Sequence, residues 1–172
     1  MRLPPTWADL NAHVSSNMRK NIRKAHEGLE RDGVAFTVRV VDRPEDVQPA
    51  AERLLALHAK RSEAADMLCH PNKFAEPPAR RFLVDHLHRV AQRGQLRIIE
   101  LEIGSQVVAN CLTFLYEGHL YLYFAGYDPA WRSYSVMTVL MTETIKWAIA
   151  RGLWHINLFT GKDQSKLRWK PA

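Results

Sequence analysis

The stretch FAGYDPAWRSYSVMTVL, residues 124–140, changes from strand to helix within a few residues and decides the fold. Its apolar beginning ends at Gly-Tyr-Asp-Pro, a loop with two serines and a tyrosine follows, and a helical pattern begins near Val136. A strand, a loop and a helix N-terminus in this order can bind a phosphate, because free backbone N–H groups and the helix dipole point toward the loop. An ordinary turn has the same order, so the stretch predicts a strand–loop–helix unit and leaves the anion site open.

The residues around this stretch predict a sheet. Three strands at residues 96–103, 107–116 and 120–127 follow one another with gaps of turn length, which predicts an antiparallel meander. The third strand is apolar on both faces, so we expect it in the middle of the sheet with a cover on each side. The helix of residues 136–152 and a short strand at 154–159 are expected to complete a right-handed β-α-β crossover.

Upstream of the meander the sequence predicts further helices and one more strand. A first helix is amphipathic, with Ser15 or Ser16 as its N-cap and Gly33 placed to end it. In chain order the predicted elements are a helix at 15–32, a strand at 34–41, a helix of about 20 residues after Pro44, and a helix at about 79–92. The fold class is therefore α/β (α+β), with a mixed, mostly antiparallel sheet flanked by helices.

Composition narrows the class of protein. The chain has 172 residues, a net charge of +6 and 47% hydrophobic residues, which suits one folded domain. The positive charge favours an anionic partner such as nucleic acid, a phosphorylated small molecule or an acidic glycan. Cys69 and Cys111 lie far apart without metal-ligand spacing, which fits a reducing, cytoplasmic setting. No apolar run reaches the roughly 18 residues of a membrane span.

Several common catalytic motifs are missing from the sequence. It contains no G-x-S-x-G, no Walker loop and no G-x-G-x-x-G, which argues against a serine hydrolase, a P-loop enzyme or a dinucleotide-dependent enzyme. His86 and His88 lie two residues apart on a predicted helix and so point to different faces. No metal site is therefore expected.

Three segments in a fixed order carry a resemblance to a known family. They are SSNMRKNIRKA at 15–25, AGYDP at 125–129 with its serine–tyrosine loop, and GKDQSKLRW at 161–169. Together they resemble the GNAT-like domain of cellulose-biosynthesis CelD-type and Fem-type acyltransferases. The resemblance implies one domain over residues 1–172, with basic N-terminal helices in 1–33 and a GNAT core in 34–172.

The resemblance also implies that the sheet lacks the last two strands of a complete GNAT fold. The short strand at 154–159 would then leave an apolar edge with unpaired N–H and C=O groups. We expect a cover for it, either from a second copy in a homodimer or from another lobe of a longer parent of which this chain is the C-terminal lobe.

For the cofactor, the resemblance implies acetyl-CoA or another acyl-CoA as co-substrate. The pantetheine arm would lie along the third strand of the meander, and the pyrophosphate would meet backbone N–H groups at the start of the next helix. The implied cofactor-binding residues are Tyr123, Phe124, Ala125, Gly126, Ser133, Ser135, Val136, Met137 and Thr138. Gly126 would allow the ligand a close approach to the backbone.

Three residues are candidates for proton transfer. Glu100 and Glu102 share one face of a strand, and a carboxylate with a raised pKa can take a proton from an amine. Paired acids on a strand also occur simply as its hydrated face. Tyr127, at the strand end beside the loop, is the preferred tyrosine for giving a proton to a leaving thiolate. Asn110 interrupts an apolar strand and, if buried, is expected to form a structural hydrogen bond.

Four residues are candidates for the substrate site. Arg19 and Arg23 lie on the basic face of the first long helix, which is either a solvated face or an anion-binding one. Asn157 stands where the family usually has an aspartate, and Lys166 matches a lysine of the family. The implied acceptor is a small molecule or a glycan-type amine or hydroxyl. Two alternatives stay open: Fem-like aminoacyl transfer from tRNA, and a non-catalytic lobe that binds or dimerises.

Overall fold

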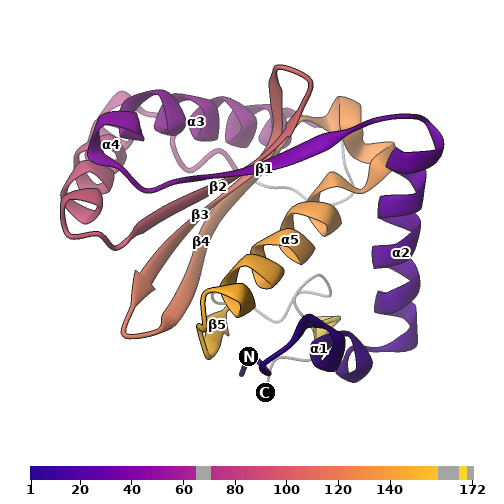
Figure 1. Cartoon of the computed structure of the whole chain (residues 1–172). Coiled ribbons are helices and arrows are strands. Elements are labelled where there is room, and N and C mark those ends of the chain that lie inside the picture. Colours follow the sequence, from indigo (N-terminus) through magenta and orange to yellow (C-terminus); the bar gives the residue numbers. More distant parts are fainter. Residues whose placement is uncertain (65–70, 159–166, 170–172) are drawn as a thin grey trace.

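The computed structural model describes residues 1–64, 71–158 and 167–169, and its centre is a five-stranded sheet (Figure 1). The strands lie in chain order, and each of the first four is antiparallel to its neighbours among them, whereas β5 runs parallel to β4. Their bounds are β1 Phe36–Val41, β2 Leu96–Ile103, β3 Gln106–Tyr116, β4 His119–Tyr127 and β5 His155–Asn157. The predicted mixed, mostly antiparallel sheet and its meander are confirmed.

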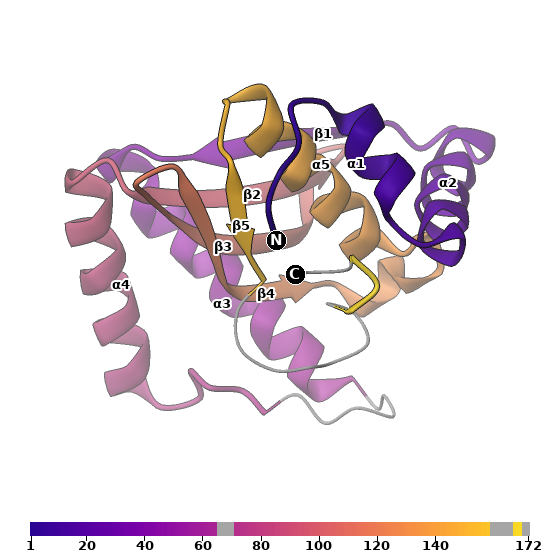
Figure 2. The same cartoon turned by 90° about the horizontal axis from the view of Figure 1, so that it is seen from below.

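Helices cover both faces of this sheet. The α-helices are α1 Trp7–His13, α2 Ser16–Arg31, α3 Val47–Glu63, α4 Pro77–Gln92 and α5 Val136–Ala150, and the 3-10 helices are η1 Pro44–Asp46 and η2 Pro129–Tyr134. Helices α3 and α4 lie on one face, α5 crosses the other, and α2 packs against α5 on the side away from the sheet (Figures 1 and 2). The predicted helices are therefore present, and α1 is an additional one.

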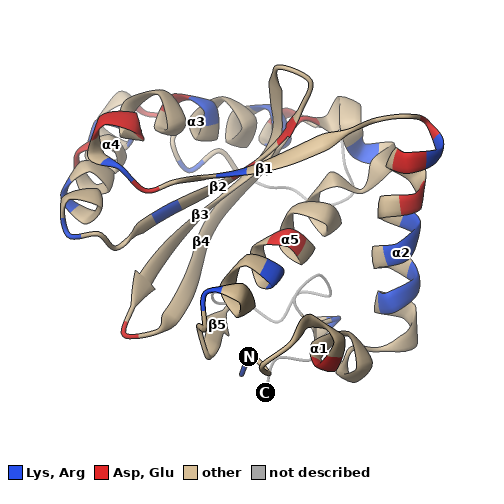
Figure 3. Cartoon of the chain, in the orientation of Figure 1, with Lys and Arg blue, Asp and Glu red and all other residues tan. Residues whose placement is uncertain are grey.

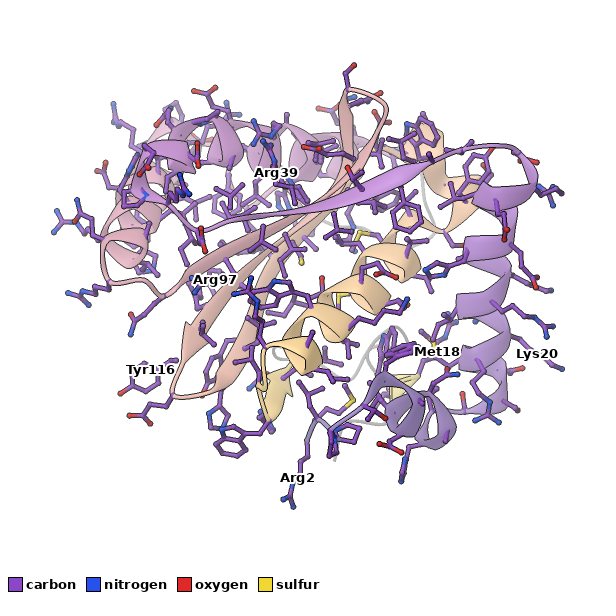
Figure 4. All side chains as sticks on the ribbon, in the orientation of Figure 1. Arg2, Met18, Lys20, Arg39, Arg97 and Tyr116 are labelled. Carbon is purple, nitrogen blue, oxygen red and sulfur yellow. The ribbon has the colours of Figure 1, made fainter. Side chains whose placement is uncertain are left out.

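The first long helix begins where the sequence places it. The Ser15 hydroxyl accepts a hydrogen bond from the Met18 N–H at 3.2 Å, which confirms Ser15 as the N-cap of α2. The helix buries residues spaced three or four apart, and Figure 4 shows Met18 pointing inward while Lys20 points away from the molecule. The amphipathic prediction for this helix is confirmed.

Strand β4 is only partly covered, unlike the prediction. It pairs with β3 on one side and with the start of β5 on the other. However, Tyr121 is 36% exposed and Tyr123 is 38% exposed, because α3 crosses β4 nearer its end and α4 packs on β2. Tyrosine suits this position, since its ring can pack while its hydroxyl meets water. The expectation that β4 is covered on both faces is therefore wrong for its first half.

The outer edge of β5 is covered by the chain itself. Arg2 forms an antiparallel bridge with His155, the Ile156 N–H donates to the Met1 carbonyl at 2.9 Å, and the Leu3 N–H donates to the Trp154 carbonyl at 2.8 Å. The unpaired edge that favoured a homodimer is thus occupied by the N-terminal segment. In the part of the chain that the structure describes, no strand follows β5, and no helix is long and apolar enough to cross a membrane.

His26 connects α2 to α5. One ring nitrogen lies 2.9 Å from the Ile22 carbonyl oxygen, and the other lies 3.2 Å from a Glu143 carboxylate oxygen. The hydrogen bond to Glu143 raises the pKa of His26, although burial opposes it. Burial raises the pKa of Glu143, but hydrogen bonds from His26 and Lys146 outweigh it, so the pKa of this carboxyl is lowered overall. The ion pair therefore needs the protonated imidazole.

This pair predicts that stability depends on pH. Because the pKa of His26 is higher in the folded chain, its contribution is fully present below its unfolded value of about 6.5 and is lost as pH rises through the raised folded value. We expect this contribution to the free energy of unfolding, measured in urea, to decrease as pH rises above about 6.5. His26→Gln should reduce this slope, and an unchanged slope in that variant would contradict the assignment.

Candidate functional site

The edge of β4 that faces β5 is open along most of its length. Strand β5 pairs only with His119, Leu120 and Tyr121, so no described strand continues along residues 122–127. The two strands separate beneath α5 (Figure 2). The Ala125 carbonyl on β4 is instead a hydrogen-bond acceptor for Arg61, with 3.2 Å between its oxygen and the guanidinium nitrogen. An unpaired strand edge offers backbone donors and acceptors to an extended ligand.

The loop after β4 is held in place by Asp128. One carboxylate oxygen accepts from the Ala130 N–H at 3.1 Å and so caps η2, while the other accepts from Lys60 at 2.6 Å and Gln106 at 3.2 Å. The hydrogen bond from Lys60 is the main reason why the pKa of Asp128 is lowered. The Gly-Tyr-Asp-Pro segment therefore forms a fixed connection between the open edge and α5.

Two backbone donors are free at the start of α5. Ser135 has the left-handed backbone angles φ 52° and ψ 43°, and its carbonyl accepts from the N–H groups of Thr138 and Val139. The N–H groups of Val136 and Met137 donate to no other residue that the structure describes. Because the dipole of this 15-residue helix adds positive potential there, the site suits an anion.

The residues at this helix start differ in how far they are exposed. Ser133 and Ser135 are exposed, while Val136 is 1% exposed and packs into the core. Met137 and Thr138 are half-buried. The predicted residues 133–138 thus lie around two N–H groups that have no described acceptor, at a helix start that is exposed at Ser133 and Ser135.

Gly126 serves the packing of α3. A Cβ atom at this position would lie 2.7 Å from the backbone nitrogen of His58 and 2.7 Å from the carbonyl carbon of Leu57. Side chains do not tolerate such distances, so glycine is required because the helix backbone approaches here. The expectation that Gly126 provides room for a ligand is corrected: α3 occupies that space.

Glu100 is a buried structural carboxylate. It is 0% exposed, Arg53 binds both its oxygens at 2.9 Å, and Arg39 binds one of them at 2.5 Å. Arg39, labelled in Figure 4, also reaches Glu102 at 3.1 Å. Glu100 therefore lies beneath α3 rather than on a hydrated face, and neither carboxylate is brought to the open edge of β4. We assign a proton-transfer role to neither.

Tyr127 lies at the far end of the open edge. Its ring is half-buried, with the Arg61 guanidinium 5.8 Å from its centroid. A bulge in the β3–β4 pairing leaves Tyr123 without an opposite residue, because Leu112 pairs with Phe124 and Thr113 with Leu122. At about 3.3 Å per residue, Tyr127 is about 13 Å further along the strand than Tyr123. Tyr121 is the last residue of β4 that pairs with β5, so Tyr123 lies two residues past the point where the strands separate, and Tyr127 lies six residues past it.

The four substrate candidates lie in different places. Arg19 donates to three carbonyls at the end of α1, the shortest at 2.7 Å to Val14, and Arg23 pairs with Glu27 at 3.5 Å. Both belong to the basic face of α2, away from β4 (Figure 3). Asn157 ends β5 and pairs with Tyr121, beside the opening, whereas Lys166 lies outside the described residues.

Two features of the site were missed from the sequence, and one expectation about a neighbouring residue was wrong. The bulge at Tyr123 and the Lys60 partner of Asp128 were not predicted. The sequence carries no signal for the bulge, because Leu120, Leu122 and Phe124 alternate regularly, and only the structure shows the leucines packing toward α5 and Phe124 toward α3. Asn110 is fully buried, but its amide has no hydrogen-bond partner among the described residues, so the expected structural hydrogen bond is not found there.

The described residues contain no group of three His, Cys, Asp or Glu that could hold a metal ion.

A family model described as the acetyltransferase (GNAT) domain matches residues 16–170 of the sequence. A search of curated proteins finds no match. Among solved structures, L-PGS from Bacillus licheniformis is similar with a TM-score of 0.63 and 14% identity, over 94% of this chain and 55% of that one. At such identity the likeness shows the fold alone.

Two further solved structures are similar over about three quarters of this chain. An aminoglycoside acetyltransferase from an uncultured soil metagenomic sample, meta-AAC0020 in complex with sisomicin, has a TM-score of 0.54 and 15% identity, over 76% of this chain and 80% of that one. AAC(6')-Iy in complex with the bisubstrate analog CoA-S-monomethyl-acetylneamine has a TM-score of 0.50 and 11% identity, over 77% and 84%.

Proposed function

Because the chain belongs to the acetyltransferase (GNAT) domain family, we propose that it transfers an acetyl or similar acyl group from acyl-CoA to an amine or hydroxyl. The observation that carries this proposal is the open edge of β4, which leads directly to the two free N–H groups of Val136 and Met137. A pantetheine arm, with its amides in an extended chain, fits the edge. A pyrophosphate fits the start of α5.

In this arrangement the protein contributes mainly by positioning the reactants. The thioester carbonyl would lie just past Tyr121, where the pairing of β4 with β5 ends, and backbone N–H groups of β4 would polarise it there. The acceptor nitrogen or oxygen forms a bond to the carbonyl carbon, and the carbon–sulfur bond breaks. The proton that the acceptor loses is transferred to the sulfur, directly or through water.

A matched pair of substitutions at Ser135 tests the anion site. Ser135→Asp adds a negative charge beside the two free N–H groups, whereas Ser135→Asn adds a neutral side chain of the same shape, and both residues tolerate left-handed backbone angles. We expect the aspartate to raise the acetyl-CoA dissociation constant at least tenfold, a loss of about 1.4 kcal/mol. The asparagine should leave it within about threefold. Isothermal titration measures both.

The wild-type titration tests the donor. Micromolar binding of acetyl-CoA, with weaker binding of ADP alone, is the expected result. Absence of binding up to millimolar acetyl-CoA would contradict the proposal and favour the non-catalytic lobe or a different donor.

A second candidate is aminoacyl transfer from tRNA in the manner of Fem-type proteins. It is favoured by the exposed basic face of α2, where the Arg23 side chain is 66% exposed. Binding of tRNA with a steep salt dependence, together with no binding of acetyl-CoA, would support this candidate instead. The closer kinship with CelD-type and Fem-type proteins and a cytoplasmic location are further proposals that rest on the sequence resemblance and composition.

A further inference from the structure

Aromatic rings line the face of the sheet opposite α5, from α4 to β4. Phe82 stacks on His86 with ring centroids 5.9 Å apart and planes within 5° of parallel. His86 meets Phe114 at 5.7 Å, and Phe114 meets Tyr123 at 5.5 Å. We call these four residues, Phe82, His86, Phe114 and Tyr123, the aromatic wall. The contacts make one continuous surface from two helical turns of α4 and two strands.

Part of the aromatic wall is exposed to solvent, whereas aromatic rings in a protein core are buried. Phe82 is 71% exposed and Tyr123 is 38% exposed, and Tyr121 beside them is 36% exposed. Further in, Phe124 and Phe74 continue the row of rings under α3 with centroids 4.8 Å apart, and Phe74 is buried. Single exposed aromatic residues are ordinary, but a contiguous group anchored on a buried one is typical of a binding surface.

The position of the aromatic wall relates it to the open edge of β4. Tyr123 is both a member of the wall and the bulged residue of β4, and it lies two residues past Tyr121, where the pairing of β4 with β5 ends. The other face of the sheet is closed here, because Leu120 and Leu122 pack toward α5. A molecule that approaches an acyl group held at the opening therefore meets the aromatic wall.

The charged residues near the aromatic wall restrict which kind of acceptor can bind there. Strand β2 carries the carboxylates Glu100 and Glu102, β3 and β4 carry none, and the loop after β4 carries Asp128. Arginine binds the first two, and Lys60 binds Asp128 at 2.6 Å. These three carboxylates are therefore already neutralised. Asp85, next to His86 on α4, adds one exposed carboxylate beside the wall, which suits one ammonium group better than a polycation. Arg80 adds positive charge nearby, where it donates to the Phe74 carbonyl at 2.7 Å.

We propose that the aromatic wall binds the acyl acceptor, and that the acceptor is a monoamine built on a ring rather than a polycation. This inference rests on the proposed function. A flat ring face, either the π face of an aromatic ring or the C–H face of a sugar ring, stacks on Phe82 and Phe114 and presents its amine to the opening at Tyr123. A single ammonium is compatible with the positive surroundings because it must be neutral to attack.

The test compares four amines as acceptors with acetyl-CoA as donor, measured by release of the CoA thiol. 2-Phenylethylamine and glucosamine carry a ring, butylamine has one amine without a ring, and spermidine is a polycation without a ring. We expect kcat/KM for at least one ring-bearing amine to exceed that for butylamine and spermidine at least tenfold. Whichever of the two ring-bearing amines has the higher kcat/KM shows whether the wall stacks on an aromatic ring or on a sugar ring.

Two matched variants assign the effect to the wall. Phe82→Ala should raise KM for the ring-bearing amine at least fivefold and leave the acetyl-CoA dissociation constant unchanged. Tyr116→Ala removes an aromatic ring that is 53% exposed but outside the wall, at the tip of the β3–β4 hairpin, and should change neither value (Figure 4). A preference for spermidine, or an unchanged KM in Phe82→Ala, would overturn the inference while acetyl-CoA binding still supports the proposed function.

A donor-free measurement separates the two proposals. NMR signals of Tyr123 should shift when the preferred ring-bearing amine is added without acetyl-CoA, and butylamine should not shift them. Such a shift with no acetyl-CoA binding would support the aromatic wall and contradict acyl-CoA as donor. If no shift is specific to the ring-bearing amine and all four amines are used equally, the proposal for the aromatic wall is contradicted but the proposed function is not.

Discussion

Gly126→Ala is expected to lower the free energy of unfolding by about 3 kcal/mol, at the upper end of what overpacking a core costs. The added methyl group would lie 2.7 Å from two backbone atoms of α3, and backbone cannot rotate away as a side chain can. The helix is also fixed at both ends of this contact, by Arg53 on Glu100 and by Lys60 on Asp128. Relief would require α3 to move off the sheet.

Urea denaturation measures this loss, and Gly28→Ala is the matched control. Gly28 lies within α2, and a Cβ atom there would meet its nearest atom, on Tyr134, at an ordinary 3.8 Å. Alanine is the better helix former by about 1 kcal/mol, so this control should be neutral or slightly stabilising. If Gly126→Ala is as stable as the wild type and loses acetyl-CoA binding, the glycine makes room for a ligand and our assignment fails.

Gly126 also shows what sequence can and cannot predict about this molecule. The glycine is visible in the sequence, and its position at the end of an apolar strand correctly indicates a close approach. Which group approaches depends on α3, whose Leu57 and His58 lie almost 70 residues earlier in the chain. Local patterns carry no information about such a partner, so the ligand and the helix could not be distinguished.

Elements that depend on local signals were predicted well. The N-cap at Ser15, the buried stripe of α2 and the three strands of the meander all follow from residues close together in sequence. The bulge at Tyr123 depends on the register between β3 and β4, and the covered edge of β5 depends on Met1 and Leu3 at the opposite end of the chain. Both required the assembled sheet.

The start of α5 depends partly on local signals and partly on the assembled structure. A strand, a loop and a helix are local features, so the sequence was sufficient to predict this strand–loop–helix unit. The free N–H groups of Val136 and Met137 depend on the left-handed turn at Ser135, which no glycine or asparagine announces. Sequence therefore predicted the start of α5 but not the backbone angles that leave these two N–H groups without a described acceptor.

Glu100→Gln is expected to lower the free energy of unfolding by about 3 kcal/mol, because removing one partner from a buried ion pair leaves the other charges uncompensated. Arg53 and Arg39 both direct guanidinium groups at this carboxylate, and a neutral amide can accept from them but cannot balance their charge. Part of the loss should be recovered by Arg53→Met in the same chain, since the double variant no longer buries that unpaired guanidinium.

The control for this prediction is Glu102→Gln. Glu102 is 27% exposed and binds Arg39 alone, so its loss should cost less than about 1 kcal/mol. The same variants decide whether either carboxylate is a general base. A base would leave stability intact and lower kcat/KM by about 10²–10⁴-fold when replaced. Replacing a structural carboxylate should instead lower stability and leave the folded molecules active. The folded fraction of Glu100→Gln should still bind acetyl-CoA, because Glu100 does not reach the open edge of β4. Full stability with lost turnover would restore Glu100 as a catalytic candidate.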